Sequence, residues 1–98
     1  MSFAAWVAKN CRFASTESDN ASFNDRNIVR QAIKMELDAI STYEQMASMV
    51  KSEKLKKVLL DVAKEEKNHA GEFEFVLGEL DKEHAPAVED GMEEAKEI

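Results

Sequence analysis

Three residues with metal-binding side chains, Glu36, Glu66 and His69, lie where the surrounding sequence pattern calls for apolar residues. Glu66 and His69 are three residues apart, so on a helix they share one face and can hold one metal ion together. Carboxylate oxygen and imidazole nitrogen, without thiolate, are ligands that suit iron or manganese. The residue types and their spacing therefore predict a metal site.

Two long helices are predicted to position these side chains, because two apolar stripes repeat at alternating steps of three and four residues. The stripes consist of Val29, Ile33, Glu36, Ile40, Tyr43, Ala47 and Val50, and of Leu55, Leu59, Val62, Glu66, His69, Phe73, Val76 and Leu80. Each stripe is apolar except near its middle, where the three candidate ligands lie. A buried carboxylate is costly unless it is paired or bound to a cation, so this placement favours a metal.

The first long helix is predicted over about residues 26–50, a segment without Gly or Pro. It should start near Ser22 to Asn24, either of which can serve as the N-cap. Asp25 then falls in the first turn, where the helix dipole favours negative charge.

The second long helix is predicted from Glu53 to about Leu80, with Ser52 as its N-cap. Pro86 suits the first turn of a short third helix that ends near Lys96. Only a tight turn fits between the two long helices, so we expect them to fold back antiparallel.

The antiparallel hairpin is expected to bring the candidate ligands to one level. Glu36 lies 16 residues before Ser52, and Glu66 and His69 lie 14 and 17 residues after it. At a rise of about 1.5 Å per residue, both groups are roughly 24 Å from the turn. The hairpin therefore places them side by side.

The chain supplies half of a known ligand set. Di-iron bundles use one Glu from each of two helices and a Glu-x-x-His from each of the other two. The sequence contains one such Glu-x-x-His, at Glu66 and His69, and no second one. Two copies related by a twofold axis would complete the set.

The composition suits a small all-α protein. The chain has 98 residues, one Pro and three Gly, and a formal net charge of −7, which argues against a nucleic-acid partner. Residues 1–21 are interpreted as a tail or a short docking segment, and residues 22–98 as the helical domain. No signal peptide and no stretch long enough to span a membrane is expected, which fits the cytoplasm. The single cysteine excludes an intrachain disulfide or a zinc ribbon.

Four stretches around the candidate ligands resemble the encapsulated ferritins, short ferritin-like proteins housed inside encapsulin nanocompartments. These stretches are residues 32–40, 43–47, 59–69 and 71–73. The similarity covers about residues 27–98.

The resemblance implies a ferritin-like protomer, a two-helix hairpin with a short third helix, that forms a four-helix bundle on dimerisation. It implies a ferroxidase that oxidises Fe(II) to Fe(III) with O2 at a di-iron centre holding two irons per dimer. Five such dimers would form an open ring, a homodecamer, that stores iron inside an encapsulin shell in the cytoplasm.

The resemblance also implies roles for individual residues. The iron ligands would be Glu36, Glu66 and His69 of both chains, and Tyr43 matches a tyrosine close to the metals. Asp38 matches one of the acidic residues that guide iron inward. Met35 stands where a second acidic residue can occur, and Thr42 replaces a tryptophan of some members, so both departures bear on the uptake route.

Three other functions share the same residues. A rubrerythrin-like peroxidase would use a similar centre, although its Cys-rich electron-transfer module is missing. A helical oligomerisation module would use the three polar residues only to specify packing. A zinc or manganese site would be redox-inactive. His84 and residues 89–97 are interpreted as an acidic surface helix, with a secondary cation site as the alternative.

Overall fold

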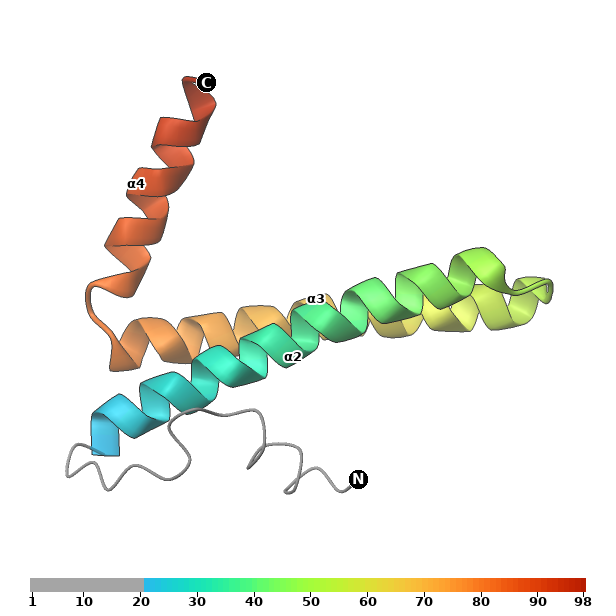
Figure 1. The fold of residues 1–98 in the computed structure, drawn as a ribbon, viewed down its shortest axis with the longest axis horizontal. Helices are drawn as coiled ribbons and strands as arrows, with labels where there is room; N and C mark the ends of the chain where they lie inside the picture. The colour runs from blue at the N-terminus through green and yellow to red at the C-terminus, as the bar shows by residue number, and fades with distance from the viewer. Residues whose placement is uncertain (1–20) are drawn as a thin grey trace.

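The computed structural model describes the backbone of residues 21–98 and the side chains from residue 24 onward. These residues form α2 (Ala21–Met49), α3 (Glu53–Leu80) and α4 (His84–Lys96), and they contain no strand (Figure 1). The all-α fold expected from the sequence is therefore confirmed. The predicted tail or docking segment, residues 1–21, lies outside the described residues except for its last residue, where α2 begins.

The start of α2 differs from the prediction. Its first residue is Ala21, so Ser22 and Asn24 lie inside the helix and the N-cap assignment is wrong. Asp25 likewise falls beyond the first turn, which holds no acidic residue. Because Ala has the highest helix propensity and no Gly or Pro follows it in this segment, the polar residues do not stop the helix from starting earlier.

The start of α3 is where the sequence predicts it. Ser52 has an extended backbone, and its hydroxyl oxygen accepts a hydrogen bond from the Leu55 backbone N–H at 3.1 Å. Glu53 lies in the first turn, where its charge complements the helix dipole. Only residues 50–52 separate α2 from α3, so the connection is the tight turn that the sequence predicts.

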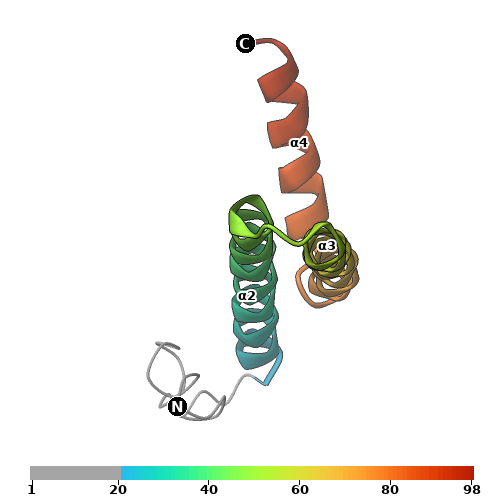
Figure 2. The same ribbon diagram turned by 90° about the vertical axis from the view of Figure 1, so that its right-hand side faces the viewer.

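A narrow core holds α2 and α3 together as an antiparallel hairpin (Figures 1 and 2). The buried apolar side chains are Ile40, Ala47, Leu59, Ala63 and Leu77. The predicted stripes are wider than this core, since Leu55 and Val76 remain 44% and 39% exposed. Two helices cover only a strip of each other's surface, so the rest of the apolar width stays open to further helices.

The chain leaves α3 at an elbow organised by Asp81. The Asp81 backbone N–H donates to the Leu77 carbonyl at 2.8 Å and so caps α3. Its side chain accepts a hydrogen bond from Arg30 Nη2 of α2 at 2.8 Å and another from the Glu83 backbone N–H at 3.1 Å. One carboxylate therefore ties both long helices to the start of α4.

α4 rises away from the hairpin and packs only near its base (Figure 2). Pro86 lies in its first turn, as predicted, and the residues from Ala85 onward are exposed. His84 departs from the surface interpretation, because its side chain is only 22% exposed and its Nε2 pairs with Glu74 Oε1 of α3. No helix among the described residues is long and apolar enough to cross a membrane.

Candidate metal centre

The hairpin brings the three predicted ligands together near its middle. Glu36 comes from α2, and Glu66 and His69 come from one turn of α3. His69 Nδ1 lies 3.7 Å from Glu36 Oε2 and 3.7 Å from Glu66 Oε2. One ligand atom from each residue lies within 4.8 Å of the other two, so the matched depth predicted from the sequence is observed.

These separations fit a shared cation better than a hydrogen-bonded cluster. A distance of 3.7 Å is longer than a hydrogen bond. Two ligands at about 2.1 Å from one ion lie roughly 3 to 4 Å apart, depending on the angle between them. Glu36 Oε2 is also buried without a hydrogen-bond partner among the described residues. The donor set and the unpartnered oxygen both fit a metal ion.

The three side chains differ in their exposure. The Glu36 and Glu66 side chains are 19% and 20% exposed, whereas the His69 side chain is 47% exposed. The site is therefore closed by the hairpin on one side and open on the other, where His69 lies. A first-row metal held here would have coordination positions left for ligands from outside this chain.

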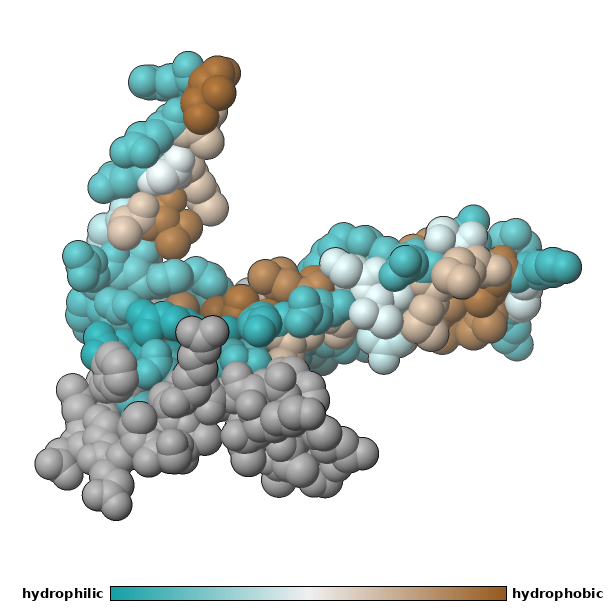
Figure 3. Space-filling view, in the orientation of Figure 1, coloured by the Kyte–Doolittle hydropathy of each residue, from teal (hydrophilic) through white to brown (hydrophobic). Residues whose placement is uncertain are grey.

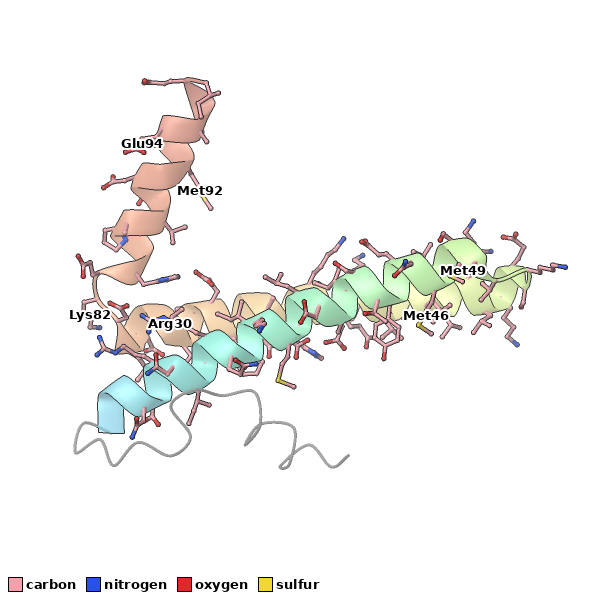
Figure 4. The ribbon with its side chains drawn as sticks, in the orientation of Figure 1. Arg30, Met46, Met49, Lys82, Met92 and Glu94 are labelled. Atoms are coloured by element: carbon pink, nitrogen blue, oxygen red, sulfur yellow. The ribbon has the colours of Figure 1, made fainter. Side chains whose placement is uncertain are left out.

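The open side is an apolar face, which we call the metal-side face. On α3 it contains Val58, Val62, His69, Phe73 and Val76, at steps of three, four and seven residues; on α2 it contains Ala32, Glu36, Ala39, Tyr43 and Met46. Val58 and Met46 are 51% and 42% exposed. Figure 4 shows Met46 pointing to the side of the hairpin opposite to α4. The candidate ligands thus lie in a surface suited to bury itself against another protein.

Tyr43 and Asp38 occupy different positions relative to this group. Tyr43 lies seven residues after Glu36 on the same face of α2 and is half-buried, which agrees with a place near the centre. Asp38 is exposed and only two residues from Glu36, so it lies on nearly the opposite side of α2. Within one chain the structure does not bring Asp38 to the three ligands.

The structure also places Thr42 and Met35, the two residues that depart from the encapsulated-ferritin pattern. The Thr42 hydroxyl donates a hydrogen bond to the Asp38 carbonyl at 2.9 Å, and Met35 is half-buried. The Arg30–Asp81 pair, by contrast, was missed in the sequence. Its members are 51 residues apart, and no local pattern signals such a contact.

A comparison with protein families matches residues 27–97 to the rubrerythrin model. The chain belongs to the rubrerythrin family. Membership supports a di-iron ferritin-like protein, and the Glu36, Glu66 and His69 group is the part of this family member that could hold metal.

Two relatives show which members of the rubrerythrin family this chain resembles. It is 52% identical over 71 residues to a ferritin-like–encapsulin shell fusion protein from Pyrococcus furiosus; the match covers 72% of the chain and 21% of that relative. The chain thus spans about a fifth of the length of the curated relative it matches. The crystal structure of the encapsulated ferritin domain from Pyrococcus furiosus superposes with a TM-score of 0.79 at 44% identity, covering 86% of each chain. The resemblance to encapsulated ferritins is confirmed.

Proposed function

We propose that this protein is a ferroxidase that oxidises Fe(II) with O2 at a di-iron centre shared between two copies. The observation that carries this proposal is the Glu36, Glu66 and His69 group on an open apolar face. Family membership supports the iron, and the half-complete ligand set supports the second copy.

One copy leaves apolar side chains exposed and provides only half of the ligand set, which supports the pairing of two copies. The metal-side face exposes Val58 and Val76 at 51% and 39%, beside a His69 side chain that is 47% exposed. A twofold axis along this face would cover the apolar side chains and bring two sets of ligands together. Two hairpins packed in this way form the four-helix bundle of di-iron proteins.

Each side chain then has a distinct task. Glu66 and His69 of one copy would hold one iron, and Glu36 of each copy would supply a carboxylate to the shared centre. The paired copies supply four carboxylates, which match the four positive charges of two Fe(II) ions. Carboxylate ligands would favour the more highly charged Fe(III). Two Fe(II) ions would then give one electron each to O2, which takes up two protons from water and leaves as hydrogen peroxide. In this proposal Tyr43 is the tyrosine close to the metals, and Asp38 is an acidic residue that guides iron inward, as the resemblance to encapsulated ferritins implies.

The setting of the reaction rests on the relatives. An open homodecameric ring cannot enclose an iron mineral, so the oxidised product needs a container. The name of the Pyrococcus furiosus relative describes a fusion with an encapsulin shell. We therefore place this protein in the cytoplasm inside an encapsulin nanocompartment, where it supplies Fe(III) for storage.

The decisive experiment compares the two histidines of the chain. His69→Ala removes a proposed ligand, whereas His84→Ala removes a histidine at the elbow. Both variants and the wild-type protein are loaded with Fe(II) without oxygen, and O2 consumption is followed after mixing. We expect the initial rate to fall by about 100-fold or more in His69→Ala, because losing even a side chain that only supports a metal ligand costs about 10- to 100-fold. We expect His84→Ala to retain most of the rate.

The same proteins, tested also for bound iron and with H2O2 in place of O2, separate the competing functions. Unchanged oxidation in His69→Ala would remove the proposed site. Iron bound without O2 consumption would indicate a redox-inactive metal site, and no bound iron at all would indicate a purely structural helical module. Faster turnover with H2O2 than with O2 would indicate a peroxidase.

A further inference from the structure

The elbow between α3 and α4 leaves an apolar cleft open to solvent. The cleft has a volume of 430 Å³, and its apolar lining comes from Phe75 and Gly78 of α3 and Ala85 of α4. The Phe75 side chain is 71% exposed, although phenylalanine is among the residues most often buried in folded proteins. An exposed aromatic ring beside a cleft is suited to contact with a further segment of polypeptide.

The apolar surface continues from the cleft along α4. Met92 lies seven residues after Ala85, two turns along the same face of the helix, and its side chain is 62% exposed. Figure 4 shows Met92 on the side of α4 that faces the hairpin, and Figure 3 shows the apolar colour along that side. We call Phe75, Gly78, Ala85 and Met92 together the elbow surface.

The rim of the elbow surface carries negative charge that no described residue neutralises. Glu72 and Glu79 lie three residues before and four residues after Phe75, so both share its face of α3. Glu89 lies about one turn along α4 from the cleft. These three glutamates are exposed and form no ion pair within the described part of the chain, and only Lys82 lines the cleft as a basic residue. An occupant should therefore present apolar side chains flanked by basic ones.

The beginning of the chain has the composition that this surface requires. Its large apolar residues are spaced so that one side of a helix would hold them all. They are Phe3, Trp6, Val7 and Phe13. The same stretch contains Lys9 and Arg12, and no acidic residue precedes Glu17. The family match begins only at residue 27, so membership of the family assigns no role to this segment.

The elbow lies within reach of this segment. Arg30 of α2 contacts Asp81 at the elbow, and Ala21, the first residue of α2, lies nine residues before Arg30, about 14 Å along the helix. Figure 1 shows the start of α2 and the elbow at the same end of the hairpin. Residues 14–20 can span up to about 23 Å. This linker is long enough to return residues 3–13 to the elbow of the same chain.

We propose that residues 3–13 dock on the elbow surface of their own chain. The apolar side chains, Trp6 among them, cover Phe75 and the apolar side of α4, and Lys9 and Arg12 meet the carboxylates at the rim. A short tether gives the segment an effective concentration on the order of millimolar at its own elbow, which favours it over a second copy. The docked segment fixes the direction of α4, which otherwise packs only near its base.

Trp6 is the only tryptophan of the chain, so its fluorescence reports on the segment directly. In the wild-type protein we expect emission at short wavelength and weak quenching by acrylamide, because the ring is shielded from water. Phe75→Ser should shift both quantities toward those of the chain unfolded in urea. Leu60→Ser removes another exposed apolar side chain from α3, far from the elbow, and should change neither. A solvent-exposed Trp6 in the wild type, or no shift in Phe75→Ser, would overturn the proposal.

A charge exchange tests the contacts at the rim. Lys9→Glu with Arg12→Glu places like charges together and should expose Trp6. Adding Glu72→Lys with Glu79→Lys in the same chain should restore the shielded emission. Circular dichroism checks that each variant keeps its helices, and failure of the second pair to restore the emission would contradict the proposed pairing of charges.

The single cysteine of the chain, Cys11, shows which copy supplies the segment. In Glu79→Cys we expect mild oxidation to form a disulfide with Cys11 within one chain, seen as a species of single-chain mass with altered mobility on a non-reducing denaturing gel. Lys51→Cys, at the far end of the hairpin, is the control and should form no such bond within the chain. If Glu79→Cys instead links Cys11 of a second chain, the occupant is another copy and the proposal fails. His69→Ala should leave the Trp6 emission and the disulfide unchanged, so the proposed function stands or falls separately.

Discussion

Glu36 carries a carboxylate whose Oε2 is buried and lacks a hydrogen-bond partner among the described residues. His69 Nδ1, at 3.7 Å, is too far to supply that hydrogen bond. An unpaired buried charge lowers stability, and proteins retain one where a ligand compensates it. In this chain the compensating ligand is the proposed iron. The Glu36 carboxylate should therefore lower the stability of the metal-free protein while it raises the affinity for iron.

Glu36→Gln separates these two effects. Without metal, we expect the free energy of unfolding to rise by about 1 kcal/mol, because the substitution removes a carboxylate whose buried Oε2 lacks a hydrogen-bond partner among the described residues. Bound iron, measured by metal analysis, should fall well below one ion per chain. Glu44→Gln, which removes an exposed partner of Lys67, serves as the control and should change both quantities little. A destabilised Glu36→Gln would show that His69 alone satisfies the carboxylate.

At the scale of the helices, the turn between α2 and α3 sets the alignment of the candidate ligands. Ser52 caps α3 through a hydrogen bond of 3.1 Å to the Leu55 N–H, and it fixes where the chain turns back. The turn in turn fixes which residues of α2 and α3 lie at one level. A single hydroxyl therefore contributes to the alignment of Glu36 with His69.

Ser52→Ala should lower the free energy of unfolding by about 1 kcal/mol, as N-cap removal usually does. Urea denaturation at a fixed protein concentration and with a chelator present measures this change. Ser41→Ala serves as the control, because Ser41 is an exposed residue in the middle of α2 and caps no helix. This substitution should be neutral or slightly stabilising. Equal effects of the two substitutions would mean that the cap carries no stability.

Much of the fold and the candidate site could be predicted because the signals are short-range. The bounds of α3, the turn at Ser52 and the level of Glu36 with His69 follow from caps and helical rise. The start of α2 was predicted too late, because several polar residues compete as caps and the local sequence does not rank them. The elbow could not be predicted, since Arg30 and Asp81 meet only after the hairpin has formed.

At the scale of the whole molecule, the described part of the chain buries few side chains and leaves much apolar surface exposed. Among residues 24–98 the core consists of five buried apolar residues, while Leu55, Val58 and Val76 remain between 39% and 51% exposed. A single hairpin of this kind gains little from its own core. Folding, pairing of copies and metal binding should therefore be coupled.

This coupling predicts a stabilisation by metal that depends on His69. Fe(II) added without oxygen at about 100 times its dissociation constant should raise the free energy of unfolding by about 2.7 kcal/mol. Thermal unfolding followed by circular dichroism would show a higher Tm with iron and a return to the starting value with excess chelator. His69→Ala should show no shift, and His84→Ala should show the full one. A shift that survives His69→Ala would place the stabilising metal elsewhere.

Half a ligand set on each chain has a consequence for mixtures of intact and damaged protein. A chain that has lost His69 would also inactivate the intact chain with which it pairs, because one of the two irons lacks its histidine and the proposed reaction draws one electron from each iron. Random pairing of equal amounts leaves only about a quarter of the pairs with both halves sound. Each damaged chain would thus inactivate an intact partner as well as itself, so the fraction of active pairs would fall faster than the fraction of intact chains.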